Sequence, residues 1–304
     1  MRKAIKNKTL LGCFCAFGCE VLFGLSFVFT KKATDVAGEF ELLGWRFFIA
    51  FAVMSLCVVT GLIPVNFKGK PIQRLIPVSI FCPVLDYIGE TVGISHTSAT
   101  ESGILFACIP VVSLIASALL LKKKPTKWQI VGIGITLFGV LVTVLAVEAS
   151  ASLSVVGYLF LTMSVVSCAL YAVFTEKASA FTGAEITYGM LAFGAVIFTG
   201  IALVQAMING TAARLLALPF QNTDFLIAVL YQGIGCSILA FFMSNVAIAN
   251  IGVNRVSSFM GVSTVTSIIA GVLILQEKLS LWQIVGAVVI VAGIYTANIR
   301  LKTE

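Results

Sequence analysis

The phrase WQIVG at Trp128–Gly132 occurs a second time in this chain, at Trp282–Gly286. Trp is the rarest aromatic residue here, with three copies, so chance is a poor explanation for a repeated phrase that contains two of them. The match extends at the same offset of 154 positions to Leu121 with Leu275, Lys124 with Lys278, and Gly139 with Gly293. Self-similarity at a fixed offset indicates a structural unit that is present in two copies.

The composition places this repeated unit in a lipid bilayer. Of the 304 residues, 59% are hydrophobic and 11% are charged, whereas a soluble domain carries about 25% charged residues. The mean hydropathy is +1.07, and the apolar stretches are continuous, which favours membrane helices over a β-barrel. Most of the eight cysteines lie inside apolar runs without zinc-ligand spacing, so we interpret them as small buried hydrophobes.

Ten stretches of the chain reach the length of about 20 apolar residues that a bilayer span requires. The first follows a basic N-terminus and is longer than the apolar part of a signal peptide, so we interpret it as an uncleaved helix. Helix breaks are expected near Pro77, Pro83 and Pro110. The expected helices are Leu10–Phe29, Glu41–Ile63, Arg74–Ser95, Glu101–Leu121, Lys127–Val147, Ser154–Phe174, Glu185–Ile208, Asp224–Ile248, Asn254–Leu275 and Leu281–Ile299.

A second repeated phrase defines the size of the unit. FTKKA at residues 29–33 corresponds to FTEKA at residues 174–178, at an offset of 145. The difference between the two offsets predicts a longer connection after the seventh helix than after the second. The chain therefore divides into two five-helix units, residues 1–149 and 150–304. Because five is odd, we expect the second unit to lie inverted in the membrane, as in many secondary transporters.

The Lys and Arg residues predict how the helices are oriented. With a cytoplasmic N-terminus, 15 of the 20 basic residues fall in cytoplasmic segments and four in outside segments, and Arg46 lies within a helix. The positive-inside rule then places both termini in the cytoplasm of a multi-pass inner-membrane protein. Lys31 and Lys32, expected outside, are an unexplained exception. The net charge of +7 is thus interpreted as a topology signal and not as nucleic-acid binding.

A resemblance to a known family appears at the second WQIVG phrase. Leu273–Gly286, LILQEKLSLWQIVG, resembles the end of an EamA domain, in which a helix ending in Leu-x-x-x-Glu precedes a turn and a Trp. Ile109–Val111 resembles the family's Pro-Val step. Two such units in ten helices, over roughly residues 10–300, are similar to the drug/metabolite transporter superfamily. Lys123 and Thr264 depart from the pattern, where Glu and Pro are expected.

The resemblance implies a secondary carrier for small metabolites such as amino acids, nucleobases or drugs. It also implies a central cavity, lined mostly by the first, third, fourth, sixth, eighth and ninth of the expected helices. The family's motifs mark the scaffold and do not identify the solute.

Three carboxylates inside the expected helices are the sharpest candidates for transport chemistry. A charge near the bilayer centre costs about 2.5–3.5 kcal/mol on insertion scales, so such residues are rare and commonly functional. Asp86 and Glu90 lie four apart on one helix face, where they are expected to share a proton or bind a cationic group. Glu20 is interpreted as a proton-binding or amine-binding carboxylate. The alternatives are a solvated rim position for Glu90 and a structural hydrogen bond for Glu20.

Other polar residues are weaker candidates for solute contact. Glu101 follows Ser98 at capping-box spacing, so a helix-capping role competes with a binding role. For uncharged residues the competing role is a hydrogen bond between helices. These uncharged candidates are Tyr87, Tyr171, Gln232 and Asn245. Arg46 is expected to extend to the membrane interface, or to pair with Glu41 or another carboxylate. His96, the only histidine, is interpreted as a solvated turn residue.

The sequence excludes several classes of function. It contains no P-loop, no dinucleotide-binding glycine pattern and no His-Glu-x-x-His zinc motif, so we expect neither an enzyme nor a bound cofactor. We predict a secondary carrier that moves a small solute by alternating access, with protons as the simplest coupling ion. The alternatives are a uniporter or channel-like facilitator and a non-transporting scaffold or regulatory subunit. The sequence leaves a homodimer open.

Overall fold

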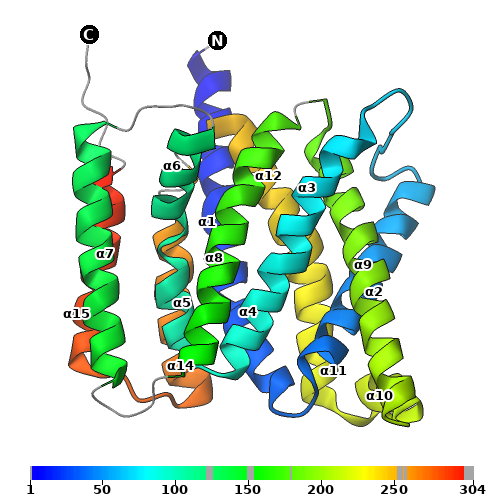
Figure 1. The fold of residues 1–304 in the computed structure, drawn as a ribbon. Helices are drawn as coiled ribbons and strands as arrows, with labels where there is room; N and C mark the ends of the chain where they lie inside the picture. Colours follow the sequence, from blue (N-terminus) through cyan, green and yellow to red (C-terminus); the bar gives the residue numbers. More distant parts are fainter. Residues whose placement is uncertain are drawn as a thin grey trace.

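The computed structural model describes residues 2–120, 126–148, 154–178, 180–251, 256 and 259–297. All regular secondary structure in these residues is helical, and none of them forms a strand. The helices run roughly parallel to one another, so their ends gather at two opposite faces of the molecule (Figure 1). The described chain is therefore an all-helical protein.

The first half of the chain contains five helical segments, two of which are broken. They are α1 (Arg2–Thr34); α2 (Glu39–Val59); η1 (Ile72–Arg74) with α3 (Leu75–Ser79), η2 (Ile80–Leu85) and α4 (Asp86–Ser95); α5 (Ala99–Phe106) with α6 (Ile109–Leu120); and α7 (Lys127–Glu148).

The second half begins with two long helices and ends with two shorter ones. Its elements are α8 (Val155–Lys177), α9 (Gly183–Ile208), α10 (Ala212–Gln221), α11 (Thr223–Leu230), η3 (Tyr231–Ala240), α12 (Phe241–Ile251), α14 (Met260–Leu275) and α15 (Leu281–Ala297). The helix start expected at Asn254 lies outside the described residues.

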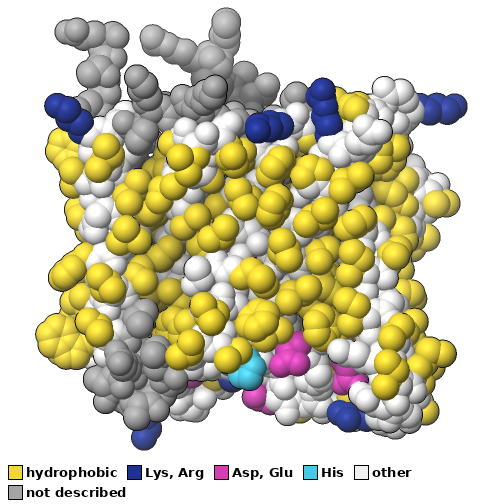
Figure 2. Space-filling view, viewed as in Figure 1, with side chains coloured by type: hydrophobic (Ala, Val, Ile, Leu, Met, Phe, Trp, Pro, Cys, Tyr) yellow, Lys and Arg dark blue, Asp and Glu magenta, His cyan; other side chains and the backbone are white. Residues whose placement is uncertain are grey.

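The described helices have the length and surface of membrane spans. Seven of them are long and apolar enough to cross a bilayer, and three shorter apolar helices lie at residues 127–143, 260–275 and 281–296. Figure 2 shows hydrophobic side chains across the middle of one face, with Lys and Arg at its upper and lower edges and Asp and Glu near the lower edge. An apolar band between two polar edges is typical of a protein embedded in a bilayer. The chain is a multi-pass membrane protein.

The breaks expected near Pro83 and Pro110 are present in the structure. Pro83 lies in the π-helical η2, where Cys82 leaves the helical region with φ −138° and ψ 114°. Helix α5 stops before Pro110, which lies in the first turn of α6, and η1 changes to α3 shortly before Pro77. Proline lacks the N–H that an interior helical position needs, so the helix is interrupted or restarted beside it.

The two WQIVG phrases open α7 and α15, which pack closely through glycines. A Cβ added at Gly139 would lie 2.9 Å from the Gly286 carbonyl oxygen, and one at Gly293 would lie 2.8 Å from the Gly132 carbonyl oxygen. Small residues allow helices in a membrane to approach this closely. Because the earlier glycine of one helix contacts the later glycine of the other, α7 and α15 run antiparallel.

Helix α10 was not expected from the sequence. It occupies the connection between α9 and α11, in the part of the chain where the offsets of the two repeats differ. Leu215 and Leu218 on one face are buried, while Leu216 and Phe220 are exposed. A helix of ten residues is too short to span a bilayer, so a criterion based on span length does not detect it.

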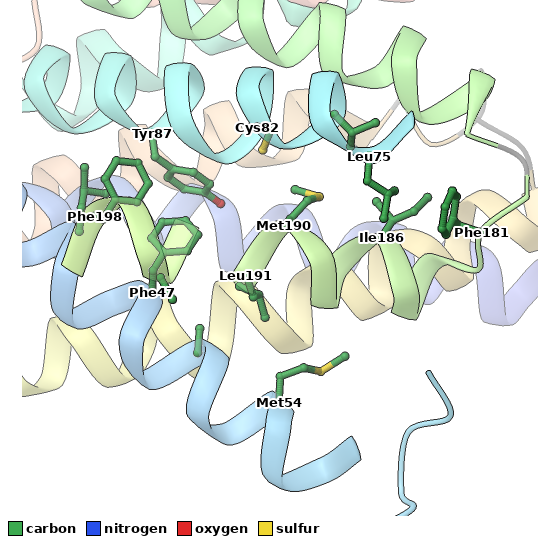
Figure 3. Close-up of a cluster of buried hydrophobic side chains, with 14 of the residues drawn as sticks. Phe47, Met54, Leu75, Cys82, Tyr87, Phe181, Ile186, Met190, Leu191 and Phe198 are labelled. Atoms are coloured by element: carbon green, nitrogen blue, oxygen red, sulfur yellow. The ribbon is translucent and has the colours of Figure 1, made fainter. Parts of the chain in front are cut away.

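The largest hydrophobic cluster joins α2, α4 and α9. Phe47 contacts two other aromatic rings of the cluster, and the centroids of the Tyr87 and Phe198 rings lie 5.2 Å and 5.0 Å from its own. Met190 and Leu191 of α9 complete the surroundings (Figure 3). Aromatic pairs at such distances add to the stabilisation from buried area. This cluster fixes Tyr87 and α4 against α2.

We predict that Gly139→Ala destabilises the protein and that Gly134→Ala on the same helix does not. At Gly139 the added methyl group would lie 2.8 Å from the Ile290 backbone nitrogen, whereas Gly134 has no atom within 4 Å. Overpacking against backbone costs about 1–3 kcal/mol. Thermal unfolding of the two purified variants measures the difference, and equal melting temperatures would contradict the α7–α15 packing.

Candidate functional site

Arg46 of α2 is buried in the helix bundle and fixed by neutral partners. Its side chain is 1% exposed. Nε donates to the Ser237 hydroxyl at 3.2 Å, and Nη1 donates to the Gln232 side-chain oxygen, also at 3.2 Å. Both acceptors belong to η3. The guanidinium group is thereby held between α2 and η3.

Two further contacts extend this arrangement to α4 and α1. The guanidinium carbon lies 4.1 Å from the centre of the Tyr87 ring, a cation–π contact. A desolvated contact of this kind is worth about 2 kcal/mol. The Gln232 amide nitrogen donates to the Thr30 hydroxyl of α1 at 2.7 Å. Tyr87 and Gln232, both expected as candidates, therefore surround Arg46.

The expectation for Arg46 was wrong. Its side chain does not extend to the interface, and Glu41 accepts instead from the Gly38 backbone N–H at 2.9 Å, at the start of α2. The ion pair formed within the described part of the chain is Lys70–Glu185, at 2.6 Å. Arg46 is thus a buried cation that contacts no carboxylate among the described residues. A basic residue deep inside an expected helix was the sequence signal that could have identified it as a buried charge.

Asp86 of α4 accepts a short hydrogen bond from α8. It is 7% exposed, and the Ser164 hydroxyl donates to Oδ1 at 2.5 Å. Gly89 brings the two helices together, because a Cβ there would lie 2.8 Å from the Ser164 backbone nitrogen. Donation to an ionised oxygen gives the shorter and stronger class of hydrogen bond.

Glu90 lies one helical turn beyond Asp86 and is also buried. It is 7% exposed, so the alternative of a solvated rim position does not hold. The described residues include no hydrogen-bond partner for its carboxylate. A carboxylate that is mostly buried and has no hydrogen-bond partner is unfavourable.

Glu20 of α1 approaches the same region from another side. It is 6% exposed and lies beside the Ser263 hydroxyl of α14. Glu20, Asp86 and Glu90 all lie within electrostatic range of Cys168 on α8. The three carboxylates singled out from the sequence therefore all lie on the inner side of the bundle near α8, without contacting one another.

The remaining candidates lie outside this centre. The capping box expected at Glu101 is present, since its backbone N–H donates to the Ser98 hydroxyl at 3.0 Å and its carboxylate accepts from the Ser98 N–H at 3.4 Å. Tyr171 is partly buried against the largest hydrophobic cluster, and His96 is exposed at the surface. The side chain of Asn245 lies outside the described residues.

The turn between α4 and α5 is held by two charged side chains whose contacts were not predicted from the sequence. Lys31 donates to the carbonyl oxygens of Ile94 at 3.3 Å and Ser95 at 3.0 Å. Glu277 accepts from the N–H groups of Ala99 at 2.8 Å and Thr100 at 3.0 Å. Cations at helix C-termini and anions at N-termini are stabilising. Lys31 thus has a structural reason to depart from the basic-residue pattern.

We define the candidate site as Arg46, Asp86, Glu90 and Glu20 with the neutral groups that hold them. Its carboxylates can take up protons or a cationic group, and its guanidinium can bind an anionic group. Among the described residues, no three His, Cys, Asp or Glu side chains converge as metal ligands. The site therefore offers charge recognition inside an apolar bundle.

Comparisons with known proteins agree on a family and a fold. A profile described as "EamA-like transporter family" matches residues 10–145 and 155–299. The "Uncharacterized transporter YcxC" of Bacillus subtilis (strain 168) is 33% identical over 302 residues, which cover 99% of this chain and 96% of that protein. The "WAT1-related protein At4g08300" of Arabidopsis thaliana is 26% identical over 254 residues, 73% of this chain and 66% of that protein.

The same fold occurs in a solved crystal structure. That structure superposes on this chain with a TM-score of 0.64 and covers 96% of each chain. The two sequences are 16% identical, so the match concerns the fold alone.

We predict that Ser164 and Asp86 are energetically coupled. In a double-mutant cycle of Ser164→Ala and Asp86→Ala, measured by equilibrium unfolding in mixed micelles, the coupling should be about 1–3 kcal/mol. The control is the cycle of Ser167→Ala with Asp86→Ala. Ser167 is buried on the same helix but has no described hydrogen bond to Asp86, so its coupling should be near zero. Additive effects in both cycles would contradict the hydrogen bond between Ser164 of α8 and Asp86 of α4.

Proposed function

Because this chain belongs to the EamA-like transporter family, we propose that it is a secondary carrier for a small metabolite in the cell inner membrane. It operates by alternating access, in which a central site opens to one side of the membrane at a time. The solute belongs to a class such as amino acids, nucleobases, amines or drug-like molecules. Membership of a transporter family and several apolar helices support this proposal.

The proposed architecture is ten spanning helices in two inverted five-helix units, residues 1–149 and 150–304. Two observations support it. The reciprocal glycine contacts, Gly139 with Gly286 and Gly132 with Gly293, are interchanged by the 154-residue offset of the repeat. In Figure 1, α1 begins and α15 ends at the same face of the molecule. With the excess of basic residues on that side, both termini are cytoplasmic.

Asp86 and Glu90 carry the proposed mechanism. The decisive observation is two carboxylates one turn apart on α4, both nine-tenths buried, of which Asp86 is held by α8 and Glu90 has no described partner. Two negative charges this close disfavour one another in an apolar surrounding. A bound proton or cationic group neutralises them, so the site can pass the apolar part of the membrane at lower cost. Glu20 is the third proposed member of this group.

Two alternative functions predict different experimental results. A uniporter or channel-like facilitator needs no titratable coupling residue, and a channel would pass ions much faster than a carrier turns over. A scaffold or regulatory subunit would bind a partner and show no solute flux when purified alone. The unpartnered buried carboxylate Glu90 favours a carrier, because neither rival requires such a group.

We predict that Asp86→Asn and Glu90→Gln each change the pH dependence of uptake in proteoliposomes. The solute for this assay comes from a thermal-shift screen of amino acids, nucleobases, amines and drugs. Each substitution keeps the side-chain shape but removes the exchangeable proton, so transport driven by a proton gradient should fall at least about tenfold. The control is Asp35→Asn, which alters an exposed carboxylate. If both variants keep the wild-type pH profile, proton coupling through this pair is excluded.

A further inference from the structure

We propose that Glu277 is a latch that holds the outer end of the carrier closed, and that the outward-closed conformation is therefore its resting state. This inference rests on the proposed alternating access between two inverted units, to which it adds a gate and a preferred conformation. Three features support it: a contact of Glu277 with the opposite unit, a buried cluster beside that contact, and a difference between the two copies of the repeat.

Glu277 joins the two five-helix units through the first turn of α5. It lies in the connection between α14 and α15, in the second unit. One carboxylate oxygen accepts from the Ala99 N–H at 2.8 Å, and the other accepts from the Thr100 N–H at 3.0 Å. Both N–H groups belong to the start of α5, in the first unit. The first N–H groups of a helix have no partner within it, so an anion at this position is stabilised.

The two helices joined by this contact are closely packed. The Thr264 hydroxyl of α14 donates to the Gly103 carbonyl oxygen of α5 at 3.2 Å. A Cβ added at Gly103 would lie 2.6 Å from the Ser267 Cβ, and one added at Gly271 would lie 2.5 Å from the Thr100 hydroxyl oxygen. Thr100, Thr264 and Ser267 are at most 1% exposed. At this end, α5 and α14 therefore leave no room for a solute between them.

A buried hydrophobic cluster completes the closure at the same end. Its side chains come from α1, α4 and α5 of the first unit and from α8 and α14 of the second, and all are at most 4% exposed. They are Phe27, Val28, Ile94, Ala99, Leu161 and Ala270. In Figure 1 the α14–α15 connection lies at the face opposite to the start of α1 and the end of α15. That face is the outer one in the proposed orientation.

The repeat offers no equivalent acceptor for the cytoplasmic end. At the 154-residue offset, Glu277 corresponds to Lys123, and Ala99 and Thr100 correspond to Val253 and Asn254. Lys123, Val253 and Asn254 lie outside the described residues, so this comparison concerns the sequence alone. A Lys ammonium group has donors only, and the positive end of a helix dipole disfavours it. The bidentate contact thus stabilises closure of the outer end and has no counterpart for closure of the other.

The test measures opening of the outer end by the reactivity of a buried thiol. Ala270→Cys, in a chain without the eight native cysteines, places that thiol in the cluster beside Glu277. The purified full chain is treated with a bulky thiol reagent in detergent without solute, and the labelling rate follows the population of the open state. Glu277→Ala removes both hydrogen bonds and should raise this rate about tenfold to a hundredfold. Glu277→Gln keeps one accepting oxygen and should raise it less.

A change at the opposite end separates a latch from a local structural contact. Lys123→Glu introduces an acceptor into the cytoplasmic copy of the repeat. It should favour closure there and raise labelling of the Ala270→Cys thiol about twofold to tenfold. The control is Glu41→Gln, because Glu41 accepts from the Gly38 N–H at the start of its own helix; the rate should not change. A separate thiol, from Ala50→Cys in the core of the largest cluster, should stay unreactive in every variant.

Each outcome decides one part of the proposal. Unchanged labelling in both Glu277 variants would overturn the latch, and unchanged labelling in Lys123→Glu would overturn the resting state. Labelling of the Ala50→Cys thiol in Glu277→Ala would show that Glu277 serves folding only. If Glu277→Ala does not fold, Glu277→Gln and Lys123→Glu decide. Solute flux in proteoliposomes tests the carrier function separately: flux with unchanged labelling overturns the latch alone, whereas no flux of any solute contradicts the carrier function.

Discussion

The cost of placing charge inside a bilayer is the constraint on which this structure depends. Arg46, Asp86, Glu90 and Glu20 all lie within apolar helices and are at least nine-tenths buried. The cost of such burial falls only when hydrogen bonds or opposite charges replace water. In this molecule Arg46 receives two neutral acceptors and an aromatic ring, and Asp86 receives a hydroxyl group. Arg46 and Glu90 take part in no described ion pair, so the cost of their burial is compensated less completely.

The two halves of the chain contribute to this site in different ways. All four charges come from α1, α2 and α4, whereas the hydrogen-bond partners of Arg46 and Asp86 come from η3 and α8. At the 154-residue offset of the repeat, Asp86 and Glu90 correspond to Ala240 and Ser244. The scaffold phrases are thus repeated between the two halves, whereas the charged residues are not.

The sequence predicted features that depend on local chemistry and missed those that depend on helix rotation. Apolar length located the helices, prolines located the breaks at Pro83 and Pro110, and spacing located the capping box at Glu101. Arg46 was assigned to the wrong environment, because a residue's depth in a helix does not say which neighbour its face meets. Lys31 was unexplained for a similar reason, since its partners lie more than sixty positions away. Asp86 and Glu90 were found because a four-residue spacing of carboxylates is visible without the fold.

The central claim is that two five-helix halves lie antiparallel in the membrane and enclose the charged site between them. The most direct measurement is labelling with a membrane-impermeant thiol reagent, in a background without the eight native cysteines. Lys127→Cys and Lys278→Cys place single thiols at exposed positions beside the two repeated phrases. The account predicts that the Lys278→Cys variant reacts in intact cells and that the Lys127→Cys variant reacts only after the cells are permeabilised. Reaction of both from the same side of the membrane would contradict it.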